Sequence, residues 1–454
     1  MKTSAKEKVS YGLGGVGYQM TLALSNAFLT LYYTDSVLIS ASFVGTMMFI
    51  ARLMDGLSDI AMGLVIEKTH SRFGKARPWV ALGAIPLAIS IVLMFNVPAS
   101  LPALPKNVYV FVTYVFMSVV CYTIVALAHS AMLPRISLDS DDRNKVAVVL
   151  GLMQGIFTAL LIGLFNPVLN VFGGHSSQNA WTVVSILIAV MSLLLLLVCF
   201  LVTKEKLSAT EKTEAEEAIP SAGKKTPLKE GLLFLFRGRY FYIILVLYLT
   251  MAVTNGTSSI GIYFVRDVLG DANLMGVLSI MSVIPMILMM PFVPKLFKTL
   301  GKRRTLLFGL TCQIAALVIM FIFPDVIPVQ MAGTFFGTLV IVPLWLAAPT
   351  MICDLVDYGD YKRGLRVEGL ATSASSFGTK LGMGLGSVIV GIGLTVGGYQ
   401  AQAAGQTAAA RQAIIWVSRG VPTVMCVICL VLVYLWDLEK YKPQVQEYMN
   451  KNRL

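Results

Sequence analysis

Long apolar stretches alternate with short polar connections along almost the whole chain. A helix needs about 20 apolar residues to cross the hydrocarbon core of a bilayer. Stretches of about that size lie near residues 10–34, 41–66, 78–97, 107–133, 146–172, 179–203, 239–264, 274–294, 304–323, 328–353, 370–397 and 413–436. This pattern predicts an all-α integral membrane protein with about twelve transmembrane helices.

One long polar segment, which begins KEKLSATEKTEAEE, divides these stretches into two sets of six. We therefore predict an N-terminal six-helix bundle at 1–203, a cytoplasmic linker at 204–238, a C-terminal six-helix bundle at 239–440 and a tail at 441–454. A short repeat supports two related halves, because GKAR at 74–77 precedes the third stretch and GKRR at 301–304 precedes the ninth. Two such halves around a midplane site resemble the major facilitator fold.

Basic residues concentrate in every second connection of this chain. Transmembrane proteins carry such basic connections on the cytoplasmic side. The odd-numbered connections hold few, chiefly Lys106, Arg266 and Arg411. We therefore expect a bacterial inner-membrane protein with both termini and the linker in the cytoplasm. The net charge of +12 then reports topology and not a nucleic-acid surface. The charged fraction of 13% is also well below the roughly 25% of soluble domains.

Three charged residues lie inside the second stretch, within the segment FIARLMDGLSDIAMGLVI. Asp55 and Asp59 are four residues apart and share a helix face, and Arg52 lies on the same side. Each such charge at mid-membrane costs about 2.5–3.5 kcal/mol on insertion scales, which predicts a polar cavity or partners in place of lipid. Capture of Na⁺ or H⁺ would relieve the repulsion between the carboxylates, with Ser58 as a further oxygen ligand. The alternative is a structural network in which Arg52 is only a charge partner.

Lys380 is a second ionisable residue within a span, in the sequence FGTKLGMGLGS. Gly378, Gly382 and Gly386 recur every four residues and predict a face that packs closely on a neighbouring helix. Lys380 stands roughly 200° around the helix from Gly378, so we expect it to point toward a central cavity. There it could bind hydroxyl groups, attract an anionic substrate or pair with the aspartates of the second span.

Polar and aromatic residues recur in other spans and could converge on one cavity, as hydroxyl-bonding groups and aromatic platforms do in sugar sites. They are Tyr18, Gln19, Tyr122, Thr123, His129, Gln154, Asn255, Thr257, Tyr263, Trp345 and Ser376. Taken singly, each is equally consistent with helix packing or interface anchoring.

Several motifs together resemble one family. They are YYTD at 32–35, RLMDGLSD at 52–59 followed by SRFGKARPW, DLVDYGDYKRGLRVEG at 354–369, and FGTKLG at 377–382. The chain is similar almost end to end to the glycoside–pentoside–hexuronide:cation symporters of the major facilitator superfamily, which include melibiose permease and the bacterial glucuronide carrier. The second of these is the more similar. The resemblance implies a secondary active symporter that imports a glycoside, pentoside or hexuronide with H⁺ or Na⁺.

The resemblance also assigns roles by position. It implies a cation site that includes the second-span aspartates, made of Asp55, Ser58, Asp59 and Thr123. It implies that Trp345, Ser376 and Lys380 line the sugar cavity, and we add Tyr18, Gln19 and Tyr122 as substrate-binding candidates. It implies a charged cytoplasmic gate made of Arg143, Asp354, Arg366 and Glu368.

Five positions depart from melibiose permease. Gln19 and Ala126 replace sugar-binding aspartates, Ser130 replaces a tryptophan and Gly151 replaces an arginine. Without those acids, and with Lys380 retained, the cavity would accept a carboxylate better, so we favour a uronide or a neutral glycoside such as a pentoside. Ser58 replaces an asparagine, which leaves Na⁺ and H⁺ both open.

Other classes of function receive less support. The sequence has no metal-binding cluster, nucleophile elbow or phosphate loop, so we expect no enzyme and no cofactor beyond the coupling ion. A lysolipid carrier on the same scaffold, or a sugar sensor that does not transport, remains as an alternative. The expected partners are a sugar, a cation and membrane lipids, without nucleic acid, and we expect a monomer.

Overall fold

The computed structural model describes residues 3–137, 140–205, 238–363, 368–401, 403, 405–441, 443–445 and 447–448. Regular structure in these ranges is helical throughout, without strands. The predicted linker at 204–238 lies outside the described residues, apart from its first two positions and its last.

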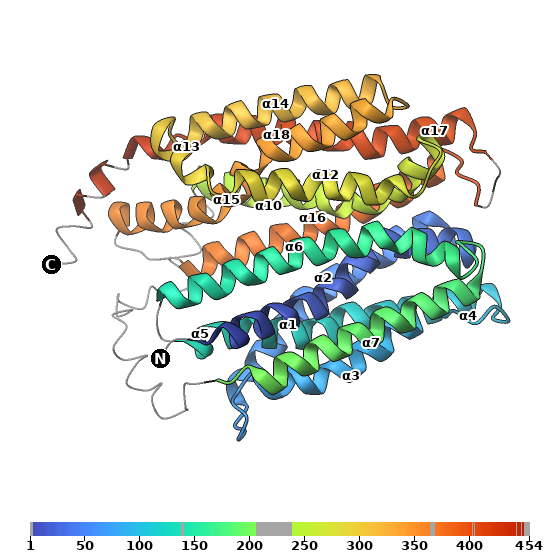
Figure 1. Ribbon diagram of the computed structural model, residues 1–454. Coiled ribbons are helices and arrows are strands. Elements are labelled where there is room, and N and C mark those ends of the chain that lie inside the picture. Colours follow the sequence, from blue (N-terminus) through green and yellow to red (C-terminus); the bar gives the residue numbers. More distant parts are fainter. Residues whose placement is uncertain are drawn as a thin grey trace. The chain divides into compact units, whose positions relative to one another are not determined.

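Helices before the linker follow one another with short connections (Figure 1). Three of them are π-helical turns that continue a neighbouring α-helix. The elements are α1 (Ala5–Leu24), η1 (Ser25–Leu29), η2 (Tyr32–Ser36), α2 (Ala41–Lys68), α3 (Arg77–Met94), α4 (Ala103–Val115), η3 (Phe116–Cys121), α5 (Tyr122–Ile136), α6 (Ser140–Val171) and α7 (Gln178–Val202).

Helices after the linker include two more π-helical turns, η5 and η6, and two short 3₁₀ turns, η4 and η7. The elements are α10 (Arg239–Gly256), η4 (Thr257–Ser259), α11 (Ile260–Tyr263), η5 (Phe264–Val268), α12 (Leu274–Met289), α13 (Val293–Thr299), α14 (Lys302–Ile322), α15 (Ile327–Arg363), α16 (Glu368–Val396), α17 (Ala408–Ile415), η6 (Trp416–Gly420), α18 (Val421–Leu435) and η7 (Leu438–Tyr441).

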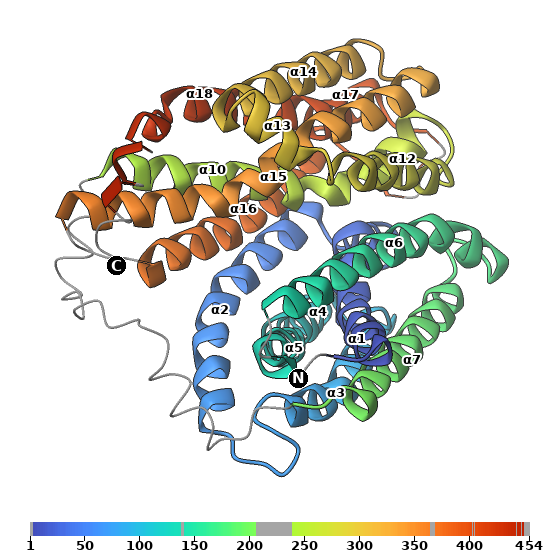
Figure 2. The same cartoon turned by 60° about the vertical axis from the view of Figure 1, so that its left-hand side comes forward.

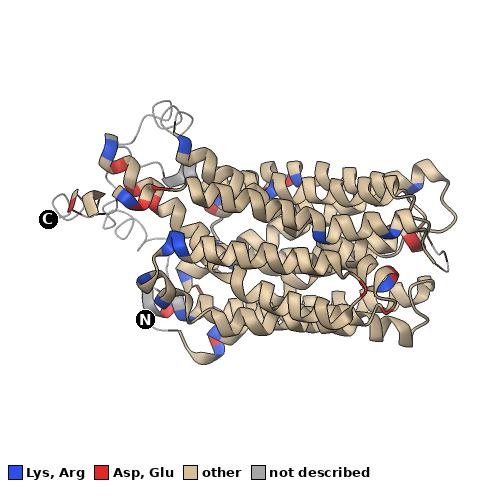
Figure 3. Cartoon of the chain, turned by 90° about the horizontal axis from the view of Figure 1, so that it is seen from above, with Lys and Arg blue, Asp and Glu red and all other residues tan. Residues whose placement is uncertain are grey.

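Most of the described helices are long and apolar enough to cross a membrane. Nine pass by length and composition, and the bent pair α12–α13 raises the number to ten. The continuous helix from Ala5 to Ser36, and α2, occupy the places of the first and second predicted spans. Figure 3 shows charged residues gathered mainly toward the helix ends. These observations confirm the predicted all-α membrane fold.

Contacts group the chain into two units that differ from the predicted bundles. The first contains Met1–Glu216, Ser258–Val283 and Ser387–Ile414, and the second contains Glu217–Thr257, Ile284–Gly386 and Ile415–Leu454. Two segments of the later helices therefore group with the first half, which they contact closely. A Cβ on Gly391, for example, would lie 2.5 Å from the Ala41 carbonyl oxygen. The division into two sets of six stays a prediction.

In the first unit, α1 packs against α6 and α7, and α3 packs against α5 and α7. Figure 2 shows α1 between α6 and α7. Their buried side chains form one core, which includes Tyr11, Val80, Leu87, Val125, Met132 and Leu196.

In the second unit, α14 packs against α15 and α18, and α10 packs against the same two helices. The glycine stripe of α16 faces α10. A Cβ would lie 2.9 Å from the Leu245 carbonyl oxygen at Gly378, 2.3 Å from that of Leu249 at Gly382, and 2.4 Å from that of Val253 at Gly386. The close-packing role predicted for these glycines is therefore confirmed.

The GKAR and GKRR segments share two local features. Gly74 and Gly301 both have positive φ, at 107° and 82°, and each leads into a helix. A glutamate that follows a later helix binds the N-terminus in each case. Glu205 accepts hydrogen bonds from the backbone N–H groups of residues 75–77, and Glu439 accepts one from that of residue 303. Each carboxylate satisfies N–H groups that a helix leaves unpaired and lies at the positive end of its dipole.

An arginine repeats beside each glutamate. The Arg77 side chain donates to the Phe200 carbonyl oxygen and lies over that ring at 4.6 Å. The Arg303 side chain donates to the Tyr434 carbonyl oxygen and lies over that ring at 5.3 Å. Each segment thus has a contact of arginine, aromatic ring and glutamate, made by the fourth residue of GKAR and by the third residue of GKRR.

Candidate functional site

The polar centre of α2 brings together three of the four predicted cation-binding residues. Thr123 donates a 2.8 Å hydrogen bond to Asp55 Oδ1. Ser58 donates to the Asp55 carbonyl oxygen at 3.0 Å and lies 3.4 Å from the Thr123 hydroxyl oxygen. Asp55 and Thr123 are buried, whereas Asp59 is half-buried one turn further along α2. Carboxylate, hydroxyl and carbonyl oxygens are the hard ligands that a small cation prefers.

Arg52 lies one turn before Asp55 and is also buried. Its Nη2 donates to the Asn26 side-chain oxygen at 3.3 Å. Asn26 belongs to η1, in the first span, and we did not single it out from the sequence. The available signal was an amide in the middle of an otherwise apolar run. The contact ties the Arg52 side chain, one turn from Asp55, to the first span.

An aromatic pair adjoins these oxygens, because Tyr122 directly precedes Thr123. The rings of Tyr18 and Tyr122 meet edge to face with centroids 5.7 Å apart. Gln154 donates to the Tyr18 hydroxyl at 3.2 Å and to the Gly15 carbonyl oxygen at 3.0 Å, which fixes the Tyr18 side chain. Half-buried Gln19 follows Tyr18 on α1. Three predicted substrate residues thus lie in the first contact unit with the cation residues.

The other predicted substrate residues belong to the second contact unit. Trp345 on α15 is 49% exposed, and its indole offers a flat apolar face. Ser376 and Lys380 lie one turn apart on α16, the first exposed and the second half-buried. Since the glycine stripe faces α10, Lys380 lies on the opposite side of α16 from that contact.

The predicted cytoplasmic gate is described only in part. Arg143 donates to the Ser137 carbonyl oxygen at 3.2 Å, and Asp354 forms an ion pair with Lys302. Arg366 lies outside the described residues. Glu368 begins α16, but its side chain is also outside the described part. The gate therefore remains a prediction from the resemblance.

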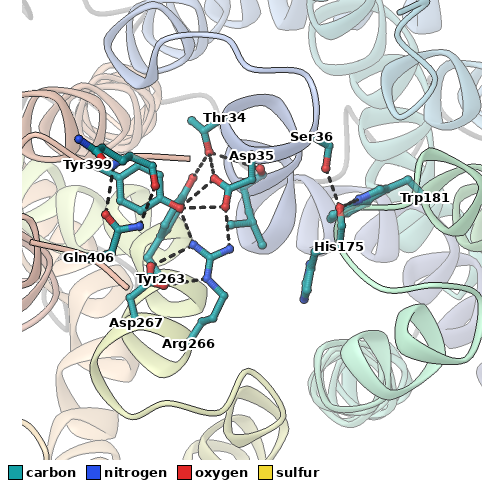
Figure 4. Close-up of polar contacts among 12 residues, drawn as sticks. Thr34, Asp35, Ser36, His175, Trp181, Tyr263, Arg266, Asp267, Tyr399 and Gln406 are labelled. Carbon is teal, nitrogen blue, oxygen red and sulfur yellow. Dashed lines mark hydrogen bonds and ion pairs between the residues drawn. The ribbon is translucent and has the colours of Figure 1, made fainter. Parts of the chain in front are cut away.

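A cluster that we did not predict joins the ends of three helices (Figure 4). We call it the Asp35 cluster, and it consists of Thr34, Asp35, Tyr263, Arg266 and Tyr399. Arg266 Nη1 donates to Asp35 Oδ2 at 2.7 Å, and the Tyr399 hydroxyl lies 2.9 Å from both carboxylate oxygens. Thr34 donates to Asp35 Oδ1 at 2.8 Å and lies 2.7 Å from the Tyr263 hydroxyl.

A second carboxylate holds the arginine of this cluster. Arg266 Nε and Nη2 donate to the two oxygens of Asp267 at 2.9 and 3.0 Å. Asp35 is only 5% exposed, so its ion pair is shielded from water. The members come from the first span, the seventh span and the segment after α16, and all lie in the first contact unit. The sequence signal was the YYTD motif and a rare basic residue in an odd-numbered connection.

Helical irregularities lie beside both polar centres. The turn η2 holds Asp35 and η5 holds Arg266, while η1 holds Asn26 and η3 ends at Cys121, just before Tyr122 and Thr123. A π turn inserts an extra residue into a helix and rotates the side chains that follow, and such turns are frequent at functional sites. Apolar periodicity does not reveal them, which is one reason that these contacts escaped prediction.

Known membrane transporters resemble this chain along nearly its whole length. The sequence matches the family described as MFS/sugar transport protein over residues 10–440. It is 29% identical to the isoprimeverose transporter of Lactiplantibacillus pentosus, across 99% of this chain and 93% of that protein. It is 26% identical to the glucuronide carrier protein homolog of Escherichia coli (strain K12), across 98% of this chain and 96% of that protein.

Solved structures show the same fold. The D-xylose–proton symporter superposes with a TM-score of 0.66 at 13% identity, covering 95% of this chain and 97% of its own. The nucleoside transporter NupG superposes with a TM-score of 0.64 at 13% identity. The superposition covers 93% of this chain and 98% of the NupG chain.

Proposed function

This chain belongs to the MFS/sugar transport protein family, and from that premise we propose that it imports a glycoside, pentoside or hexuronide together with Na⁺ or H⁺. It is a multi-pass membrane transporter of the sugar symporter type and not an enzyme. The observation that carries the proposal is the buried Asp55 carboxylate, held by the Thr123 hydroxyl inside a membrane span.

The cation would bind at Asp55 and Asp59, with Ser58 and Thr123 as further oxygen ligands. Either Na⁺ or a proton neutralises part of the negative charge that α2 carries into the membrane. A neutralised site costs less to move between two environments than a charged one. A relative in Escherichia coli is named for glycoside and cation symport, which supports cation coupling.

The sugar would contact Tyr18, Gln19, Tyr122, Trp345, Ser376 and Lys380. Amide, hydroxyl and ammonium groups bind sugar hydroxyls, and aromatic faces pack on the apolar face of a pyranose ring. A carboxylate on the sugar would gain a charge-assisted hydrogen bond from Lys380. Gln19 in place of an acid supports a neutral or anionic glycoside.

Transport would proceed by alternating access, in which two gates open in turn around the bound solutes. The Asp35 cluster would be the extracellular gate, because it ties the first span to the seventh and to the segment after α16. Its ion pair must separate for that side to open. Arg143, Asp354, Arg366 and Glu368 would close the cytoplasmic side, with both termini in the cytoplasm of a bacterial cell.

Uptake into right-side-out vesicles tests this function. Labelled glucuronide, xyloside and galactoside would each be offered under an imposed Na⁺ gradient, an imposed H⁺ gradient or no gradient. We expect one sugar class to accumulate under one gradient, and uncoupling of that gradient to abolish the accumulation. Equal uptake with and without both gradients, for every sugar, would refute symport.

The lysolipid alternative receives less support. Three relatives that match 88–99% of this chain are named for sugars or glycosides. The first contact unit also offers polar groups, Gln19 and Gln154, next to the Tyr18–Tyr122 pair, where an acyl chain would need an apolar lining. A lysolipid carrier would transfer labelled lysophospholipid in the same vesicles, which we do not expect.

A further inference from the structure

A pocket of about 590 Å³ lies where α14 begins and α18 ends, away from the residues assigned to transport. Its polar lining consists of Arg303, Arg304, Tyr434, Asp437, Glu439 and Lys440. All of these belong to the second contact unit. The pocket is independent of the proposed function, because it contains none of the predicted sugar, cation or gate residues.

The two carboxylates of the pocket already have partners. Asp437 pairs with Arg239 and accepts from the Tyr240 hydroxyl at 2.6 Å, and Glu439 accepts from the Arg303 backbone N–H at 3.1 Å. Lys440 also pairs with Asp437, at 3.6 Å, but its side chain stays largely exposed, and the two arginines are less fully engaged. Arg304 is exposed, and the described residues give it no ion pair.

Arg303 also has unused hydrogen-bonding capacity. One of its nitrogens donates to the Tyr434 carbonyl oxygen, but its Nε is buried and has no hydrogen-bond partner among the described residues. A buried donor without a partner is costly, so a small shift of the Arg303 side chain toward an acceptor in the pocket would be favourable. The N-terminus of α14 adds the positive end of a helix dipole at the same place.

The wall below these charges is apolar and faces outward. Leu300 and Leu307 line the pocket. Phe308 lies one turn below Arg304 on α14 and is 68% exposed, and Tyr434 on α18 is 64% exposed. Side chains of this kind, exposed on a membrane span, face the acyl chains of lipid. The pocket thus combines a cationic end with an apolar side.

We propose that this pocket binds the phosphate headgroup of an anionic phospholipid such as phosphatidylglycerol, with the acyl chains along α14 and α18. Arg303, Arg304 and Lys440 would hold the phosphate, in the manner of basic pockets at the cytoplasmic ends of transmembrane helices. A free phosphate would use the same cations. The apolar wall favours the lipid as the source, since it gives a lipid contacts that a soluble anion cannot make.

Native mass spectrometry of the purified full-length protein tests this site. Phosphatidylglycerol, phosphatidylcholine and inorganic phosphate would be titrated separately against the wild type and the Arg303→Gln/Arg304→Gln variant. Each basic group near a phosphate contributes about fivefold, so we expect the variant to bind phosphatidylglycerol about thirtyfold more weakly. Phosphatidylcholine should bind both proteins equally and weakly, and inorganic phosphate should bind neither.

Lys295→Gln/Lys298→Gln is the matched control, because it removes two exposed positive charges from α13, outside the pocket. If this control lost as much affinity for phosphatidylglycerol as the arginine variant, the effect would come from overall charge and the proposed site would be overturned. Binding of inorganic phosphate as tight as that of phosphatidylglycerol would overturn the lipid assignment. Arg304→Gln alone changes only an exposed side chain, so it gives a second test if the double variant does not fold. A fivefold loss of phosphatidylglycerol affinity in Arg304→Gln supports the proposal, and unchanged affinity overturns it.

Discussion

Asp55 illustrates what a charge inside a span requires. A carboxylate at mid-membrane costs about 2.5–3.5 kcal/mol on insertion scales, so it persists where a partner or an ion compensates it. Here the Thr123 hydroxyl donates to the carboxylate, and Arg52 stands one turn away on the same helix. A carboxylate can accept about four hydrogen bonds or bind a cation, so the Thr123 contact is compatible with an ion at the same place.

Thr123 therefore offers a test at the level of one atom. Thr123→Val removes the hydroxyl that donates to Asp55 and keeps the shape of the side chain. A hydrogen bond to a charged group contributes about 1.5–3 kcal/mol, so we expect the apparent cation affinity in uptake assays to fall about tenfold to a hundredfold. Thr123→Ser restores the hydroxyl and should recover most of the affinity. Equal cation dependence in the valine and serine variants would remove Thr123 from the site.

Asp142 gives a prediction for pH and stability outside the spans. Lys8 pairs with its carboxylate at 2.6 Å, and Thr3 donates to it from its backbone N–H and its hydroxyl, both at 2.7 Å. These contacts, led by the Lys8 contact, hold the pKa of Asp142 well below its usual range. A lowered folded-state pKa stabilises the protein above the unfolded value of about 3.9, and the contribution is lost as pH falls below it.

We therefore expect Asp142→Asn to lower the midpoint of thermal unfolding at pH 7. The difference from the wild type should stay constant down to about pH 5 and shrink below about pH 4. Thermal unfolding in detergent across this range measures it. A difference that already shrinks between pH 8 and pH 6 would show that another group is responsible.

At the level of elements, the sequence predicted regular features well and irregular ones poorly. Apolar length located the spans, and the spacing of Gly378, Gly382 and Gly386 identified the face of α16 that meets α10. Asn26 and the Asp35 cluster escaped because they depend on π turns and on segments far apart in the sequence. Hydrophobic periodicity contains neither kind of information, since it reports one helix at a time.

The α16–α10 contact can be tested by adding one methyl group. A Cβ at Gly382 would lie 2.3 Å from a backbone carbonyl oxygen, which cannot move aside without separating the helices. Overpacking of this kind costs about 1–3 kcal/mol, so Gly382→Ala should lower thermal stability in detergent. Gly155→Ala is the control, because no neighbouring part of the described chain lies within 4 Å of a Cβ added there, and it should be neutral or stabilising. Equal effects of the two substitutions would contradict close packing.

At the level of the whole molecule, the Asp35 cluster is the contact that transport would have to break and remake. It joins a residue of the first span to one of the seventh and to Tyr399, beyond the eleventh. A shielded ion pair is costly when only one partner is removed, because the other charge is left buried. The Asp35–Arg266 pair therefore suits a gate with two stable states, closed and open, because a partly separated pair would leave buried charges without partners.

Single and double neutralisation distinguishes this role from a passive one. Asp35→Asn and Arg266→Gln should each slow uptake about tenfold or more, because each leaves one charge without its partner. The double variant should recover part of the rate, and the cycle measures the coupling between the two residues. Losses that simply add would show that the two side chains act independently and would contradict a shared gate.

The most direct test of the whole account is sugar accumulation by Asp55→Asn in vesicles with an imposed cation gradient. Asp271→Asn, which changes an exposed aspartate outside α2, is the matched control. We predict that Asp55→Asn loses accumulation against a sugar gradient but keeps sugar exchange at equal concentrations, while Asp271→Asn behaves as wild type. Accumulation by Asp55→Asn at the wild-type level, under the same gradient, would contradict cation coupling at α2.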